Sequence, residues 1–115
     1  QGKQAREEGI KLLVETVGTI AGKAPAILGG DFNSPTDSPI FRPLTKCMKS
    51  AREKAPVSDN EGTFNGFGSA PDTIVIDHIY FRGKLRCQRF ETLKGDYGAP
   101  YISDHYPIAA VFAFQ

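Results

Sequence analysis

The 115-residue sequence holds two cysteines, one methionine and no tryptophan, and its charges nearly balance. Two cysteines exclude a disulfide scaffold or a cysteine-rich zinc module, and the spacing of Cys47 and Cys87 leaves open whether they are free or bonded. A formal net charge of +1 argues against a strong field toward nucleic acid or an anionic membrane. No apolar run approaches the roughly 18 residues of a membrane span. The compartment stays open, because periplasmic, secreted and cytoplasmic locations all fit.

The residues that are present are typical of a globular protein. Hydrophobic residues make up 40% of the chain and charged residues 23%, which is the balance of a folded domain with a modest core. The length corresponds to one domain at most. Twelve glycines and eight prolines indicate many loops, which is where binding sites are commonly built.

Hydrophobic periodicity predicts two helices. The first spans about residues 3–21 and stops at Gly22. A second, short helix would have Pro39 in its first turn and either Asp37 or Ser38 as its cap. The apolar face of the first helix consists of Ile10, Leu13, Val14, Val17 and Ile20, and that of the second of Ile40, Phe41 and Leu44.

Four segments have the composition of β-strands. The run at residues 26–30 is short and apolar and fits a strand buried on both faces. The strongest signal, at residues 72–81, is rich in β-branched and aromatic residues. Two further strands are predicted at residues 85–93 and 107–114, separated by a loop at residues 94–100, and one face of the last strand carries Ile108, Ala110, Phe112 and Phe114. The order of these elements predicts a layered α/β or α+β fold.

Three polar clusters follow or interrupt the predicted strands. A strand end holds its backbone rigidly, and ligands of layered α/β folds commonly bind there. We therefore expect the functional site at these clusters, which are Gly30-Asp31-Phe32-Asn33, Asp77-His78 and Ser103-Asp104-His105.

The first cluster places Asp31 two residues before Asn33. If strand geometry persists, both side chains point to one face. One would then orient a water molecule while the other donates to an anionic oxygen. The alternative is an Asx turn that closes the strand, and the residues alone leave both interpretations open.

The other two clusters suggest an Asp–His pair. A carboxylate inside an apolar strand is costly unless paired, so we expect Asp77 to have a histidine partner that it orients and makes more basic; the alternative is an edge-strand carboxylate in solvent. His78 points to the opposite face and is interpreted as structural or peripheral. Asp104 would suit Mg²⁺ as a hard oxygen ligand, and His105 would serve as a base, an acid or an anion binder. The alternative for both residues is an ordinary turn.

Three motifs together resemble the endonuclease/exonuclease/phosphatase superfamily. They are Gly30-Asp31-Phe32-Asn33-Ser34-Pro35, Ile76-Asp77-His78-Ile79 and Ser103-Asp104-His105-Tyr106-Pro107-Ile108. They occur in the order of that superfamily, which includes DNase I, abasic-site endonucleases, neutral sphingomyelinases, inositol polyphosphate 5-phosphatases and deadenylases. The resemblance covers nearly the whole chain.

The resemblance implies a metal-dependent hydrolase of phosphate esters, either a phosphodiesterase or a phosphatase. In the family pattern Asp31 positions or deprotonates the attacking water, and Asn33 stabilises charge on the phosphoryl group. His105 binds the scissile phosphate or shares a proton with it, and Asp77 pairs with that histidine. Asp104 lies at the site of the metal, which is Mg²⁺ or Mn²⁺.

The resemblance also implies a substrate-side loop and a fold. The segment 63–67 looks like the substrate-side loop, which makes Thr63 and Asn65 candidate substrate-binding residues. The implied fold is α/β (α+β layered): half of the DNase I-like four-layer α/β sandwich, a mostly antiparallel sheet with helices on one face.

The chain differs from the family in its length. The family domain is about twice as long, and its first half carries a glutamate that is a principal metal ligand. Glu7, Glu8 and Glu15 lie on the exposed face of the first predicted helix, so none of them replaces it. We therefore expect residues 1–115 to be the C-terminal half of the domain.

A half domain would expose the apolar face of its sheet. We accordingly expect its partner to be the N-terminal half of the domain or a second copy of the chain, bound through that face. The alternative function is a non-catalytic binding or interaction fragment that retains the fold and lacks the metal-binding glutamate.

The substrate stays open among nucleic acid, phospholipid and sugar phosphate. One basic cluster, Arg82, Lys84, Arg86 and Arg89, fits the hydrated charges of a hairpin, and an isoelectric point near 8.0 does not indicate a broad DNA footprint. Four aromatic residues near the predicted site either stack on a base or a sugar or pack the loops; they are Phe64, Phe67, Tyr97 and Tyr101.

Overall fold

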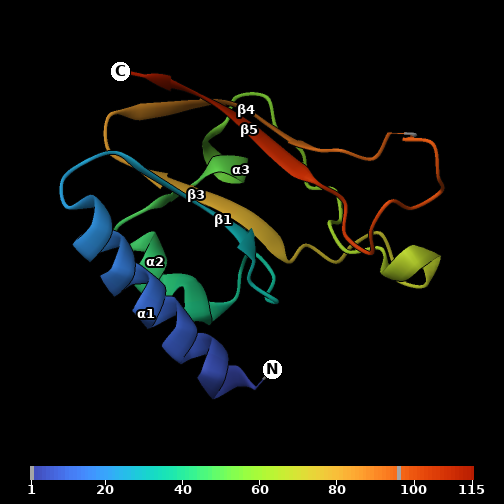
Figure 1. Cartoon of the computed structure of the whole chain (residues 1–115), viewed down its shortest axis with the longest axis horizontal. Coiled ribbons are helices and arrows are strands. Elements are labelled where there is room, and N and C mark those ends of the chain that lie inside the picture. Colours follow the sequence, from blue (N-terminus) through green and yellow to red (C-terminus); the bar gives the residue numbers. More distant parts are fainter. Residues whose placement is uncertain (1, 96) are drawn as a thin grey trace.

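The chain folds into two small antiparallel sheets with helices packed against them (Figure 1). The computed structural model describes residues 2–95 and 97–115; Asp96, in the predicted loop 94–100, lies outside the described residues. The elements in order are α1 (Lys3–Ala21), β1 (Ala26–Asp31), η1 (Pro39–Phe41), α2 (Arg42–Thr45), β2 (Lys49–Ser50), α3 (Ala51–Lys54), η2 (Gly66–Gly68), β3 (Asp77–Arg82), β4 (Leu85–Thr92) and β5 (Ile108–Phe114). This arrangement confirms the predicted layered fold class. None of the described helices has the length and apolarity to cross a membrane.

Helix α1 forms where its periodicity predicts it. Its inner face contributes Ile10, Leu13, Val14 and Val17 to a hydrophobic cluster. Ile20, predicted on the same face, is instead 81% exposed, because the last turn extends past that cluster. Gly22 ends the helix with a φ of 57°, and its N–H donates to the Gly18 carbonyl at 3.0 Å. A glycine accepts such a positive φ without the cost that a side chain would add, so the chain can leave the helix here.

Strands β1 and β3 form the ladder that carries the candidate site. They pair antiparallel, from Ala26 opposite Arg82 to Asp31 opposite Asp77. Side chains of directly opposed residues lie on the same face of a sheet. The ladder therefore ends with two carboxylates on one face.

Two strand predictions need correction. Strand β1 is not buried on both faces: Ile27 is 55% exposed on one face, and Leu28, on the other, is half-buried against the cluster beside α1. Strand β3 begins at Asp77 and not at residue 72. Residues 72–76 run instead beside the segment 62–64, where the Thr63 N–H donates to the Ile74 carbonyl at 2.8 Å. Strands β4 and β5 form within a residue of their predicted bounds.

Two hydrophobic clusters lie on opposite faces of β3. Consecutive strand residues point to opposite faces, so Tyr80 faces α1 and α2 while Phe81 faces α3, β4 and β5. The first cluster comprises Ile10, Ile40, Phe41, Leu44, Met48 and Tyr80. The second comprises Ala51, Ala55, Phe81, Leu85, Cys87 and Phe90, with Ile108, Ala110 and Phe112 packed against it. Phe114, predicted on the same face of the last strand, is exposed, and both cysteines are free.

The core makes a prediction for stability. Leu44 is fully buried in the first cluster, whereas Leu12 on α1 is 63% exposed. Leu44→Ala should lower the free energy of unfolding by about 2–5 kcal/mol, because it removes buried apolar surface and leaves a cavity. The matched control Leu12→Ala should change it by less than about 0.5 kcal/mol. Chemical denaturation measures both, and equal losses in the two variants would contradict this packing.

Candidate active site

His105 lies between the two carboxylates that end the β1–β3 ladder. Its Nδ1 is 2.8 Å from Asp77 Oδ2, and its Nε2 is 3.7 Å from Asp31 Oδ2. This geometry confirms the prediction that Asp77 pairs with a histidine. The three side chains come from β1, β3 and the loop before β5, so the fold alone brings them together.

The backbone around His105 is fixed to the segment 63–66. Phe64 and His105 form an isolated antiparallel bridge, and the Tyr106 N–H donates to the Thr63 carbonyl at 2.7 Å. The Phe64 ring lies edge-on to the imidazole, with centroids 5.1 Å apart. These contacts fix the orientation of the His105 ring, so that Nε2 faces Asp31.

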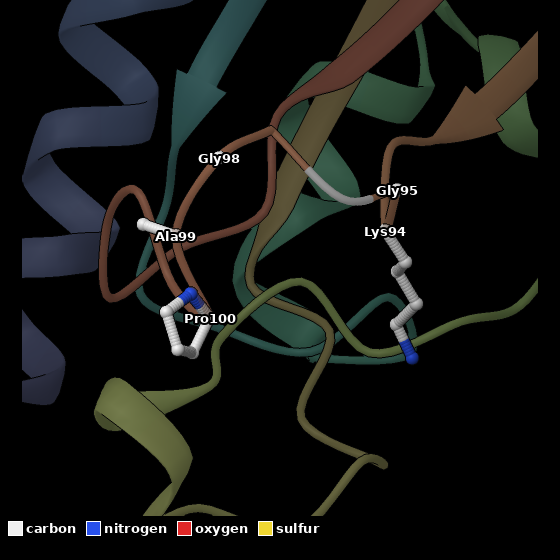
Figure 2. Close-up of a pocket in the computed structure, with 5 residues that line it drawn as sticks. All are labelled: Lys94, Gly95, Gly98, Ala99 and Pro100. Carbon is white, nitrogen blue, oxygen red and sulfur yellow. The ribbon is translucent and has the colours of Figure 1, made fainter.

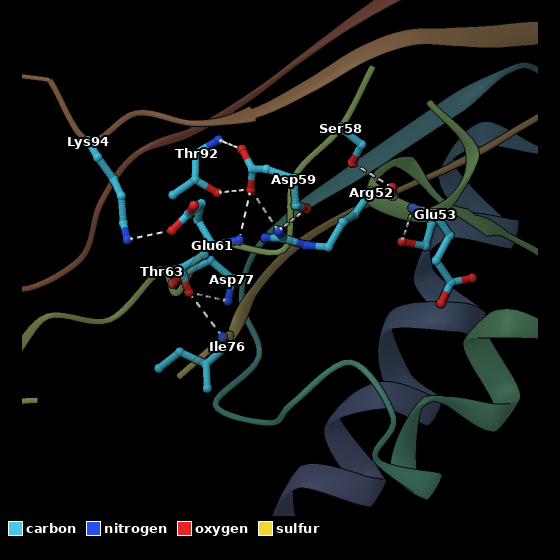
Figure 3. A network of polar contacts seen from close by, with 11 residues as sticks. Arg52, Glu53, Ser58, Asp59, Glu61, Thr63, Ile76, Asp77, Thr92 and Lys94 are labelled. Atoms are coloured by element: carbon cyan, nitrogen blue, oxygen red, sulfur yellow. Dashed lines mark hydrogen bonds and ion pairs between the residues drawn. The ribbon is translucent and has the colours of Figure 1, made fainter. Parts of the chain in front are cut away.

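Thr63 and Asn65, the candidate substrate-binding residues, have internal partners. The Thr63 hydroxyl accepts the N–H groups of Ile76 at 3.0 Å and Asp77 at 3.2 Å (Figure 3). The Asn65 amide donates to the Ser103 carbonyl at 3.1 Å. Both side chains are almost fully buried, so the structure assigns them the task of holding the site together. Their contact with a substrate stays a prediction.

A partly buried polar network supports this segment, and no sequence pattern predicted it. Asp59 accepts hydrogen bonds from the Arg52 guanidinium at 3.1 Å and from the Thr92 hydroxyl at 2.9 Å (Figure 3). Burial alone would raise the pKa of Asp59, but hydrogen bonds from Thr92 and Glu61, together with the Arg52 charge, outweigh it and lower the pKa. Arg52 also lies over the Phe90 ring at 4.3 Å. The network therefore joins α3, β4 and the chain leading to Thr63.

Asn33 does not share a face with Asp31 in the predicted way. Strand β1 ends at Asp31, and Asn33 adopts a left-handed φ of 54°. Its N–H donates to Asp31 Oδ1 at 2.8 Å, which is the Asx turn that the sequence left as an alternative. The turn leaves Oδ2 of Asp31 directed at His105 and Asn33 exposed beside it.

The charges around His105 favour its protonated form. Burial alone would lower its pKa, but the hydrogen bond and charge of Asp77, with the charges of Asp31 and Asp104, outweigh burial and raise the pKa above 6.5. Because a carboxylate only accepts hydrogen bonds, Nδ1 carries a proton toward Asp77. Nε2 is then the nitrogen that gains or loses a proton at the site.

The side chains fit a hard divalent cation in part. Asp31, Asp77 and His105 offer ligand atoms within 4.8 Å of one another, but the Asp77–His105 bond engages two of these residues. Asp104, the predicted metal ligand, is half-buried, with its Oδ1 3.5 Å from Ser103 Oγ. Mg²⁺ commonly takes one or two carboxylates and fills its shell with waters and substrate oxygens. Asp104 is not part of the Asp31–Asp77–His105 group, so its role as a metal ligand stays a prediction.

His78 has a structural place, in line with its interpretation from the sequence. Its Nε2 is 2.8 Å from the Ser34 carbonyl, which ties the turn after Asp31 to β3. Its ring packs among those of Phe32 and Phe41. Burial lowers the pKa of His78, so it is neutral at physiological pH.

Several hollows lie among the described residues, and Asp77 and His105 together line one of them. A hollow of about 400 Å³ is lined by Gly29, Gly30, Asp77, Ile79, Ser103, His105, Tyr106, Pro107 and Ile108. A second, of about 540 Å³, is lined by Lys94, Gly95, Gly98, Ala99 and Pro100 (Figure 2). The Lys94 ammonium is already paired with Glu61 at 2.9 Å. The hollow at His105 therefore holds the reactive groups.

Two residues of the basic cluster, Arg82 and Arg89, have partners within the fold. The Arg82 guanidinium donates to the carbonyls of Gly22 and Ala24, where the chain leaves α1. Arg89 pairs with Glu91 at 3.2 Å. These partners fit the interpretation of this cluster as ordinary hairpin charges.

Comparison with known proteins places this site in a family context. The model of the endonuclease/exonuclease/phosphatase family matches residues 4–105. A Bacteroides vulgatus endonuclease/exonuclease/phosphatase structure is 28% identical, with a TM-score of 0.86, over 99% of this chain and 46% of its own. A mannosyl-6-phosphatase of Bacteroides thetaiotaomicron is 28% identical, with a TM-score of 0.82, over 98% and 47%. This chain thus spans about half the length of these solved structures, and no curated protein matches it.

The Asp77–His105 bond makes a prediction for pH. A raised pKa means that folding favours the imidazolium, so its stabilising contribution is complete below the unfolded pKa of about 6.5 and is lost as pH rises through the folded value. An NMR titration should place the His105 midpoint above 6.5, and Asp77→Asn should lower it. Asp37→Asn, an exposed carboxylate elsewhere, is the matched control. Identical midpoints in wild type and Asp77→Asn would contradict the pairing.

Proposed function

Because this chain belongs to the endonuclease/exonuclease/phosphatase family, we propose that it carries the Asp–His–Asp centre of a phosphate-ester hydrolase. The observation that supports this most strongly is His105 between two carboxylates, at 2.8 Å from Asp77 and 3.7 Å from Asp31. One carboxylate holds the imidazole through Nδ1, and the other faces Nε2.

The roles follow from which atoms are free. Asp31 Oδ2 orients the attacking water and takes its proton as the water oxygen bonds to phosphorus. The bond to the leaving oxygen breaks, and that oxygen departs as an alcohol with a proton from solvent water. His105, protonated, donates from Nε2 to a phosphoryl oxygen and balances charge there. Asp77 keeps the ring in place and favours its charged form. Asn33, exposed beside Asp31, donates its amide to the phosphoryl group.

A divalent cation, Mg²⁺ or Mn²⁺, is part of the proposal. When bound, it supplies Lewis-acid stabilisation of the charge on the phosphoryl oxygens. In this chain the carboxylate of Asp104 would hold it. One carboxylate makes a weak site alone, so further ligands would come from outside residues 1–115.

We further propose that residues 1–115 are the C-terminal half of the catalytic domain. The chain spans 46–47% of the solved structures it resembles. It also exposes apolar side chains on the site-bearing face of β1 and on β5, at Ile27 and Val111. A second half of the domain would cover this surface and complete the metal site.

A phosphate monoester of a small molecule is the favoured substrate class. The similar mannosyl-6-phosphatase acts, by its name, on a sugar phosphate. The net charge of +1 is also far from the strongly basic balance typical of nucleic-acid-binding domains. Phosphodiesters belong in the same assay panel, because the Asp–His–Asp geometry suits either reaction.

Activity of the intact protein tests the proposal. It should hydrolyse phosphate esters in the presence of Mg²⁺, and Asp31→Asn or His105→Ala should lower kcat by about 10²–10⁴-fold, the usual contribution of a positioned acid or base. Asp37→Asn should leave turnover unchanged. Circular dichroism and denaturation of each variant would show that folding is retained.

Two outcomes contradict this assignment. Full turnover in His105→Ala would remove the centre from the reaction. Absence of turnover of every monoester and diester, with Mg²⁺ and with Mn²⁺, would favour the alternative of a non-catalytic binding or interaction fragment.

The half-domain proposal has its own test. Expressed by itself, the chain should self-associate, because exposed apolar surface is buried between copies when its natural cover is missing. Light scattering at high concentration measures this, and Ile27→Lys should shift the chain toward monomer. A wild-type chain that stays monomeric would contradict the proposal.

A further inference from the structure

Away from the candidate active site, a hollow of about 290 Å³ lies where four segments of the chain meet. The segments are the turn after β1, the end of α2, the stretch from β2 through α3, and β3. None of the lining residues lines the hollow at His105. We call it the α2–β2 hollow; its lining residues are Thr36, Thr45, Met48, Lys49, Ser50, Glu53, Lys54 and Tyr80. Pockets for small molecules begin at about this size.

Tyr80 presents a hydroxyl group that the rest of the protein does not use. The residue is 1% exposed, and its ring packs against those of Phe32 and Phe41. Within the part of the chain that the structure describes, the Tyr80 hydroxyl has no hydrogen-bond partner. Buried tyrosine hydroxyls usually find one. Because packing encloses the ring and Tyr80 lines the α2–β2 hollow, a molecule in that hollow can supply the partner.

The phenol keeps its proton and is therefore a donor. Burial, with a smaller contribution from the charge of Glu53, raises the pKa of Tyr80 to about 12. Ser50 lies directly opposite Tyr80 in the β2–β3 register, so the two side chains share a face of the sheet. The Ser50 hydroxyl accepts the Glu53 N–H at 3.4 Å, which leaves its own proton free to donate. Two hydroxyl donors thus lie side by side at this hollow.

Charged side chains of both signs line the same hollow. Lys49, Glu53 and Lys54 are all exposed. Among residues 2–95 and 97–115, none of the three has an ion-pair partner. Figure 3 shows the Glu53 side chain extending away from the Arg52–Asp59 network. The two ammonium groups can donate to an anion, and the carboxylate can only accept, which suits the hydroxyl groups of a ligand.

We propose that the α2–β2 hollow is a second binding site, for a small anion that also carries hydroxyl groups. The anionic group binds Lys49 and Lys54, the ligand hydroxyls donate to Glu53, and the Tyr80 hydroxyl donates to a ligand oxygen. Glu53 disfavours a compact anion without hydroxyls, and the lysines disfavour a neutral sugar. A sugar phosphate and a sugar acid share the required chemistry. The inference is independent of the proposed hydrolysis, because the two sites have no residue in common.

NMR chemical shifts test this site residue by residue on the intact protein, without added divalent cation. The probes are glucose 6-phosphate, gluconate, glucose and inorganic phosphate. Glucose 6-phosphate or gluconate should shift the amide resonances of Ser50 and Glu53 saturably, with a Kd below about 1 mM. Glucose and inorganic phosphate should bind at least about tenfold more weakly. The anion that binds more tightly identifies the charged group as phosphate or carboxylate.

Three variants separate ligand binding from packing. Tyr80→Phe should raise the Kd about 3–10-fold, the effect of losing one hydrogen bond. It should leave the thermal unfolding temperature unchanged, because the hydroxyl has no partner among the described residues. Lys49→Gln combined with Lys54→Gln should raise the Kd about tenfold or more, since hydrogen bonds between ions are the stronger ones. Lys46→Gln, at an exposed lysine that does not line the hollow, is the matched control and should leave the Kd unchanged.

Each contrary outcome overturns the site and leaves the proposed hydrolase standing. Shifts confined to residues around His105 would place all binding at the candidate active site. Equal affinity for all four probes would remove the required combination of charge and hydroxyls. An equal loss in Lys46→Gln would reduce the effect to general attraction by surface charge. Conversely, saturable binding at Ser50 and Glu53 in a protein that hydrolyses no phosphate ester would support this site and count only against the hydrolase.

Discussion

Two like charges stand opposite one another at the end of the β1–β3 ladder, and the site depends on how they are balanced. The register that pairs Asp31 with Asp77 places both carboxylates on one face, an arrangement that destabilises a sheet when nothing compensates it. His105 lies between them and contacts Asp77 directly. The two carboxylates raise the pKa of His105, because the positive imidazolium relieves the repulsion between them. A constraint of the sheet thus becomes the charged centre that we propose acts on a phosphoryl group.

Holding His105 there requires polar groups that are themselves buried. The Thr63 hydroxyl accepts two backbone N–H groups at the start of β3, and the backbone of the same residue accepts from Tyr106. Asp59, which precedes Thr63 in the chain, accepts hydrogen bonds from both Arg52 and Thr92. Buried polar groups are costly unless they are bonded, so this network tolerates few arrangements. Its rigidity keeps the imidazole and both carboxylates in register.

The success of sequence-based prediction depended on how local each interaction is. Helix α1 matched its predicted bounds because its spacing of apolar residues and its glycine stop lie within the helix. The predicted start of β3 at residue 72 was wrong, because the segment 72–76 forms hydrogen bonds with the segment around Thr63 and not with a neighbouring strand. The Asn33 prediction left two conformations open, and the Asx turn was the one formed. The prediction that Ile20 is buried was wrong, because the extent of the neighbouring core determines how far along the helix the apolar face is covered.

The fold class, the motifs and the expectation that Asp77 needs a histidine could all be read from residue types and their order. The approach of Asp31 to His105 and the internal partners of Thr63 and Asn65 could not. These contacts join segments that lie far apart in the chain. Residue types state which charges and rings are available, but strand register and loop hydrogen bonds determine which of them meet.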